Sequence, residues 1–119
     1  DCISLINTLT GMVIDIERRR PVLANNTGGV SGAGIMPVAL RMVYEAAHAV
    51  DIPVIGMGGI ESGKDAIAFM MAGAKAVQVG TSNFTDGYSI PRIVKEIDEW
   101  LGRHGVVDIN EIVDTLILN

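Results

Sequence analysis

The sequence predicts an α/β fold in which about three parallel strands alternate with helices and one β-hairpin is inserted. The first observation is the stretch Pro53–Thr81, where a helical pattern joins two short apolar runs. Such a pattern is typical of a βαβ unit, whose strands are parallel. The second observation is the composition, with 49% hydrophobic residues, 19% charged residues and 14 glycines. Buried parallel strands joined by glycine-rich loops give this profile. Residues 1–119 are too few for two domains, so we interpret them as one segment of a single domain.

Charge and cysteine content exclude several classes of function. The formal net charge is −5, whereas a nucleic-acid surface needs clustered Lys and Arg. We interpret the one basic cluster, Arg18–Arg20, as a solvated loop tip. A single cysteine, Cys2, excludes a disulfide framework and fits a reducing compartment. No apolar run approaches the roughly 18 residues of a membrane span. We therefore expect a cytoplasmic protein that binds neither nucleic acid nor membrane.

The first element is a short buried strand followed by a hairpin. Ile3–Ile6 is an apolar run that ends at Asn7 and Thr8, two polar residues at the carboxyl end of the predicted strand. Asn-Thr also occurs as simple turn chemistry. Residues 12–25 predict a β-hairpin with its tip at Glu17–Pro21, which in a barrel would project above the mouth.

A glycine-rich loop and a helix come next. Gly28–Gly34 holds four glycines in seven residues. Because glycine loses the most chain entropy on ordering, we expect a loop that meets a ligand closely, with Ser31 offering a hydroxyl. A helix is predicted from about Ile35 to Val50, with Pro37 in its first turn. Its apolar face is predicted to hold Ile35, Val38, Met42, Ala46 and Ala49, and its polar face to hold Arg41, Glu45 and a solvated His48.

The βαβ unit has clear boundaries. The strand Pro53–Met57 runs into glycines, and Ser62 with Asp65 forms a capping box that starts the next helix. Gly73 fits the position that ends this helix. The strand Ala76–Val79 follows.

The remainder of the chain is predicted to be helical. Residues 82–87 form a loop or a single helical turn, and Ser89 caps a long helix that ends at Gly105. Glu99 and Arg103 are spaced to pair on its outer side. Asp108 and Glu111 cap a last short helix. The apolar face of the long helix is predicted to consist of Ile90, Ile93, Val94, Ile97, Trp100 and Leu101.

The ends of the three strands predict a binding site for a phosphorylated ligand. In parallel α/β folds the carboxyl ends of the strands share one edge, and function gathers there. Glycine exposes main-chain N–H groups, and the N-terminus of a following helix favours an anion. No acidic pair, Cys/His cluster or Ser-His-Asp order occurs at these ends, so we expect binding and positioning, with no metal site. Three strands cannot close a barrel. The sheet must therefore be completed by further residues or by another chain, or it must be a smaller non-barrel sheet. Because the chain begins inside an apolar run, we expect the C-terminal part of a longer protein, and the predicted phosphate site at the last two strands fits a (β/α)₈ TIM barrel.

Five segments in order carry a resemblance to a known family. Each glycine motif alone is shared by many flavin and phosphate barrels, but the ordered set is specific. The set resembles the C-terminal part of the dihydroorotate dehydrogenases, and it is closest to the NAD-linked class (type 1B). The similarity runs along essentially the whole chain. The segments are Ile6–Leu9, Ala24–Gly32, Ile35–Arg41, Ile55–Gly59 and Val77–Thr81.

The resemblance implies an FMN-binding (β/α)₈ barrel that oxidises dihydroorotate to orotate in pyrimidine biosynthesis. It implies that Asn7 and Thr8 hold the pyrimidine substrate. It also implies an oligomer with an electron-transfer subunit that carries FAD and an iron–sulfur cluster. The residues that would hold FMN, partly through its phosphate, are Ile6, Gly32, Gly58, Gly59, Gly80 and Thr81.

The family's catalytic cysteine, its lysine beside the flavin and its first five strands have no counterpart here. Cys2 lies in the strand before Asn7 and is not assigned that role. We therefore expect the isolated chain to be colourless and inactive. One alternative is the FMN barrel of a dihydropyrimidine dehydrogenase, which shares the Gly28–Gly32 motif. Another is a non-catalytic half-barrel that self-associates through its open edges. A weaker alternative is an unrelated phosphosugar-binding barrel.

Overall fold

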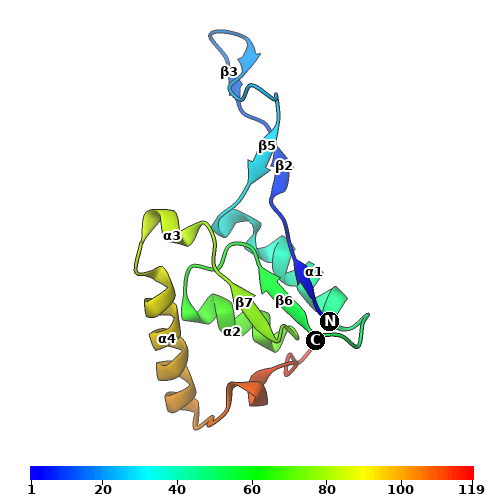
Figure 1. Cartoon of the computed structure of the whole chain (residues 1–119), viewed down its shortest axis with the longest axis vertical. Coiled ribbons are helices and arrows are strands. Elements are labelled where there is room, and N and C mark those ends of the chain that lie inside the picture. Colours follow the sequence, from blue (N-terminus) through cyan, green and yellow to red (C-terminus); the bar gives the residue numbers. More distant parts are fainter.

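A computed structural model describes the whole chain, Asp1–Asn119 (Figure 1). Its centre is a parallel three-stranded sheet in the order β1-β6-β7. The strands are β1 (Ile3–Leu5), β6 (Val54–Met57) and β7 (Ala76–Gln78). Ile3 pairs with Val54, and Met57 pairs with Gln78. The predicted parallel α/β fold is confirmed, and it is consistent with part of a (β/α)₈ barrel. The outer edges of β1 and β7 pair with no other strand.

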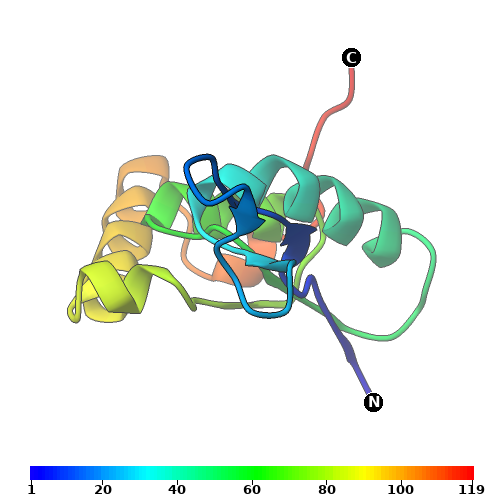
Figure 2. The same cartoon turned by 90° about the horizontal axis from the view of Figure 1, so that it is seen from above.

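Helices cover one face of this sheet. Helix α1 (Met36–Ala47) packs on β6, and α2 (Gly63–Met71) packs on β7 and on α4 (Ser89–His104). Seen from above, α1 lies on one side of the strands (Figure 2). The core between the layers includes Val43 and Phe69, each 0% exposed. None of the helices has the length and apolar character that a membrane crossing requires.

Two β-ribbons in tandem form an arm, Leu9–Val30, which projects from the body (Figure 1). At its base β2 (Leu9–Gly11) pairs antiparallel with β5 (Gly28–Val30). At its tip β3 (Ile14–Asp15) pairs with β4 (Arg20–Pro21). The predicted hairpin is therefore confirmed and is longer than expected, but its tip is shorter than Glu17–Pro21, because Arg20 and Pro21 pair with β3.

The glycine run is not entirely a loop, which corrects the sequence prediction. Gly28 and Gly29 form a strand that pairs with Gly11 and Thr10 of β2, and their missing Cβ atoms leave room for neighbouring side chains. A Cβ on Gly28 would lie 2.5 Å from Leu23 Cδ1, and one on Gly29 would collide with the Thr8 hydroxyl. The rest of the run passes into a 3₁₀ turn, η1 (Ala33–Ile35), before α1.

The predicted buried face of α1 was right only in part. Ile35 is buried and Met42 and Ala46 pack against the core, but Val38 is 37% exposed and Ala49 is exposed. The most buried residues of the helix, Ala39 and Val43, were not predicted. The stripe is shifted because Ala39, with its small side chain, allows α1 to approach the backbone at Gly58, where an added Cβ would lie 2.8 Å from Ala39 Cβ.

The start of α4 also differs from the prediction. Ser89 is the first helical residue, and the N-cap is Tyr88 without a side-chain cap. Instead of capping, the buried Ser89 hydroxyl donates to Asn83 Oδ1 at 2.9 Å. Glu99 pairs with Lys95, at 3.6 Å, rather than with Arg103.

The other helix boundaries follow the sequence signals. Ser62 and Asp65 form the capping box of α2, and Gly73 follows its end with a φ of +108°. Helix α3 (Ser82–Thr85) is the single turn that was predicted. Asp108 and Glu111 form a second capping box, although the element is a 3₁₀ turn, η2 (Ile109–Ile112).

The C-terminal segment crosses back to the helices. Asp114 N–H donates to Met70 O at 3.1 Å, and Asp114 Oδ1 lies 3.1 Å from His48 Nε2 at the end of α1. His48 is exposed, as predicted, and its side chain contacts the Asp114 carboxylate at the surface.

Candidate functional site

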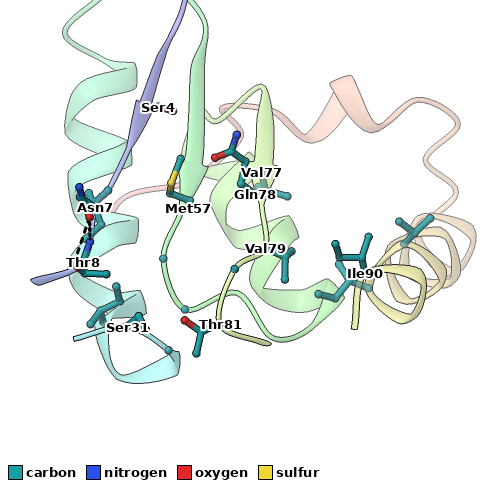
Figure 3. Close-up of a pocket in the computed structure, with 18 of the residues that line it drawn as sticks. Ser4, Asn7, Thr8, Ser31, Met57, Val77, Gln78, Val79, Thr81 and Ile90 are labelled. Carbon is teal, nitrogen blue, oxygen red and sulfur yellow. Dashed lines mark hydrogen bonds between the residues drawn. The ribbon is translucent and has the colours of Figure 1, made fainter. Parts of the chain in front are cut away.

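A cavity of about 940 Å³ lies at the carboxyl ends of the three strands (Figure 3). It is bounded by the end of β1, the loop after β5, the ends of β6 and β7, and one side of α4. All eight residues that the sequence analysis assigned to ligands line it, namely Ile6, Asn7, Thr8, Gly32, Gly58, Gly59, Gly80 and Thr81. The structure therefore brings four separate stretches of sequence to one place.

Asn7 is oriented by its neighbour. The N–H and the hydroxyl of Thr8 donate to Asn7 Oδ1 at 2.7 and 3.3 Å. The oxygen of the side-chain amide is therefore already engaged, and its two N–H donors remain to bind an acceptor. Asn7 is thus set up as a donor toward a carbonyl or carboxylate oxygen.

Main-chain N–H groups gather on the opposite wall. The N–H groups of Gly58, Gly59, Gly80 and Thr81 donate no hydrogen bond within the chain. No other atom lies within 4 Å of the Cβ position at Gly80. Free N–H groups beside open space form a cradle for an anion such as a phosphate. The residues present therefore fit a phosphate group.

Asn83 holds the Gly80 loop in this orientation. Its side-chain amide donates to the carbonyls of Val79 and Gly80 at 2.9 and 3.1 Å, and its Oδ1 accepts from the Ser89 hydroxyl. With the carbonyls bound to Asn83, the N–H groups of the loop are left for a ligand. No sequence pattern marks this residue, because an isolated Asn after a strand is common in turns.

Gly58 and Gly59 are required by packing as well as by any ligand. Both have positive φ values, +125° and +78°, and a Cβ on Gly59 would lie 2.8 Å from Gly32 O. The glycines let the end of β6 lie directly against η1 and α1. They therefore keep the Gly32 wall and the Gly59 wall of the cavity together.

The N-terminus of α2 is not part of the anion cradle, which corrects the sequence interpretation. Gly63 N–H donates to Glu96 Oε2 of α4 at 2.6 Å, and Ser62 N–H donates to Asp65 Oδ2 at 2.9 Å. The positive end of this helix is thus occupied by carboxylates of the chain itself. The hydrogen bond from Gly63 N–H, assisted by Arg92, lowers the pKa of Glu96 below its ordinary value of 4.5.

We expect Glu96→Gln to destabilise the fold in a pH-dependent way. A lowered pKa in the folded state means that the Glu96 carboxylate stabilises the fold above pH 4.5, and that this contribution is lost as the pH falls through the folded pKa. The difference in urea midpoint between wild type and variant should be largest near neutral pH and should shrink in acid. Glu99→Gln, which removes only an exposed pair with Lys95, is the control and should show a small difference. A wild-type advantage that persists unchanged at pH 2.5 would contradict the assignment.

Some residues of the cavity were missed. They include Met57 and Gln78 on the sheet and Ile90 and Val94 on α4. Gln78 could have been found, because it is the one polar residue in the apolar run Ala76–Val79. Cys2 lies exposed before the amino end of β1, away from the mouth.

Comparison with known proteins decides the family. A family model described as dihydroorotate dehydrogenase matches residues 1–101. The chain belongs to the dihydroorotate dehydrogenase family. Its relatives include the catalytic subunits of dihydroorotate dehydrogenase B (NAD(+)) from Geobacter metallireducens and Bacteroides fragilis, which are 58% and 53% identical. Each match covers 98% of this chain and 38% of the relative. The chain thus spans about two fifths of the length of these dihydroorotate dehydrogenases.

Proposed function

We propose that the whole protein to which this segment belongs catalyses the FMN-dependent oxidation of dihydroorotate to orotate in pyrimidine biosynthesis. The observation that carries the proposal is the arrangement of the cavity, whose lining combines two glycine loops with free main-chain N–H groups and the oriented amide of Asn7. A phosphorylated cofactor and a pyrimidine would thus be held at opposite sides of one site. The family membership of the chain supports the same activity.

FMN would be held at its phosphate by the N–H groups of Gly59, Gly80 and Thr81. Gly32 adds room on the same side, since the nearest atom to its Cβ position is Thr81 Cγ2 at 3.7 Å. Ile6, 7% exposed, offers an apolar surface to a ring. When bound, FMN supplies the two-electron acceptor that this oxidation needs.

The pyrimidine would be held by Asn7 and Thr8. Dihydroorotate carries ring carbonyls and a carboxylate, all of which accept hydrogen bonds. The free N–H donors of Asn7 match these acceptors, because Thr8 already occupies the Asn7 oxygen. The Thr8 hydroxyl is a second group at this wall.

The proton acceptor of the reaction must come from outside this segment. The residues that line the cavity include no Asp, Glu, His, Cys or Lys, so the segment offers no general base. We therefore propose that the segment alone is inactive and that the remaining strands supply the base. The relatives are named as catalytic subunits of an NAD(+)-linked enzyme, which supports an electron-transfer partner subunit with FAD and an iron–sulfur cluster. We assign this assembly to the cytoplasm.

The experiment is an amide-resolved NMR titration of the 119-residue chain with inorganic phosphate. We expect the amide signals of Gly59, Gly80 and Thr81 to shift. The Gly63 amide, bound to Glu96, serves as the control and should stay unchanged. A response at Gly63 without one at Gly80 would place the anion at α2 and contradict the proposed cradle.

The same preparation tests whether the segment alone is inactive. We expect it to be colourless as purified and to form no orotate from dihydroorotate, while the native polypeptide, about three times as long, should show flavin absorbance. If the purified chain is yellow and dihydroorotate bleaches it, the proposal that the general base lies outside this segment is wrong.

A further inference from the structure

The two faces of the sheet have different neighbours. Val54 is 2% exposed under the helices, and a Cβ on Gly56 would lie 2.6 Å from Phe69 Cδ1 of α2. Because side chains alternate along a strand, Ile55 and Met57 point away from the helices. Met57 pairs with Gln78 on β7, so Gln78 points to the same uncovered face.

This direction places Gln78 in the cavity. Gln78 lies two positions before Gly80. Because residues two apart lie on the same face of a strand, Gln78 lies on the face that leads to Gly80, the first residue of the anion cradle on this strand. Figure 3 draws its side-chain amide beside Met57, and Thr81 lies lower in the same view. Gln78 is exposed in this structure, so any polar partner that it has must come from a molecule or segment that enters the cavity.

The cavity contains only two side-chain amides, those of Asn7 and Gln78. Asn7 already uses its oxygen for Thr8, so only Gln78 offers an acceptor and a donor together. That pair is complementary to an imide edge, in which an N–H stands between two carbonyls. A sugar or ribityl hydroxyl would bind a Ser or Thr hydroxyl equally well and would not require Gln. The planar amide of Gln78, in contrast, matches a planar imide.

We propose that Gln78 is a specificity-determining residue that recognises the imide edge of a pyrimidine-type ring. The inference rests on the proposed function and deepens it. Two ligands carry this edge, the ring system of FMN and the dihydroorotate or orotate ring. The shared chemistry is an N–H donated to the Gln78 oxygen and a carbonyl that accepts from its amide.

The test compares three probes on the full 119-residue chain by NMR titration: FMN, orotate and inorganic phosphate. Gln78→Met keeps the length of the side chain and removes both hydrogen bonds. Two net hydrogen bonds of about 1 kcal/mol each correspond to a loss of affinity of about thirtyfold. We expect this loss for FMN or for orotate, with the phosphate affinity within about twofold of wild type. Lys64→Met, on the exposed side of α2, is the matched control and should change none of the three.

The outcomes separate the inference from the function on which it rests. A loss confined to FMN assigns the imide edge to the flavin, and a loss confined to orotate assigns it to the substrate. Unchanged affinity for both rings overturns the role of Gln78 and leaves the cradle intact. Equal losses for all three probes also overturn it, because they indicate a general disturbance of the cavity. Wild-type chain that binds phosphate but neither ring at millimolar concentration also overturns it. Wild-type chain that does not respond to phosphate at all refutes the proposed function itself. Should Gln78→Met not fold, Gln78→Glu keeps the shape, removes the donor, and is expected to weaken ring binding in the same way.

Discussion

Replacing Phe69 with Ala should destabilise the chain by about 3–5 kcal/mol. Phe69 is 0% exposed, and its ring fills the space above Gly56 on the central strand. The variant leaves a cavity between α2 and β6 that the backbone of the sheet cannot close. A loss of this size is a large part of the roughly 5–15 kcal/mol that stabilises a typical domain. Urea unfolding followed by circular dichroism measures it.

Phe84→Ala provides the matched control for that experiment. The same side chain is removed, but Phe84 on α3 is 91% exposed. We expect a change within about 0.5 kcal/mol. Equal losses for the two variants would mean that the packing of α2 on Gly56 does not stabilise the chain.

The second large effect is expected for Gly59→Ala. The left-handed backbone, with a φ of +78°, costs an L-residue about 1–2 kcal/mol. The added Cβ also meets Gly32 O and Met36 Cβ, each at 2.8 Å, and such overpacking costs a further 1–3 kcal/mol, approximately. We expect a loss of about 2–5 kcal/mol in urea unfolding, together with displacement of η1 from the end of β6.

Gly105→Ala separates these two causes. Gly105 has a similar φ of +66°, but no atom lies within 4 Å of its Cβ position. It should therefore show only the conformational cost of about 1–2 kcal/mol. If Gly59→Ala costs no more than Gly105→Ala, the close contact between η1 and β6 is not a constraint on the fold.

Local patterns predicted the elements of this chain well. Capping boxes at Ser62 and Asp108 involve residues three apart, and the glycines at Gly73 and Gly105 stop helices through their own backbone preference. The apolar runs of β6 and β7 are likewise visible in a few residues. These patterns depend only on residues that are close in the sequence, so they can be recognised from the sequence alone.

The errors arose where a distant neighbour decided the outcome. Ala39 faces the core because Gly58, on another strand, lets α1 come close. Ser89 does not cap α4, because its buried hydroxyl donates to Asn83 Oδ1 instead. The Gly28–Gly29 segment is a strand because it pairs with β2, and its missing side chains leave room for Thr8 and Leu23. None of these contacts is encoded in the spacing of the residues concerned.

The candidate site was predictable in its members but not in its electrostatics. Parallel topology brings strand ends together, so Asn7, Gly59 and Gly80 could be grouped from the sequence. The pairing of Gly63 with Glu96 could not, since those residues belong to different helices. It removes the N-terminus of α2 from the cradle and leaves the phosphate to the main chain of the two loops.

The order of the sheet also has a consequence for how the chain folds. Strands β6 and β7 are joined by one helix and can pair early, whereas β1 reaches β6 only across the arm and α1. Closing that long loop costs chain entropy before its contacts form, so we expect β1 to be the last strand to add to the sheet. Asn7 and Thr8 extend from β1. We therefore expect the two sides of the candidate site to meet late in folding, so that a ligand spanning them would bind only the folded chain.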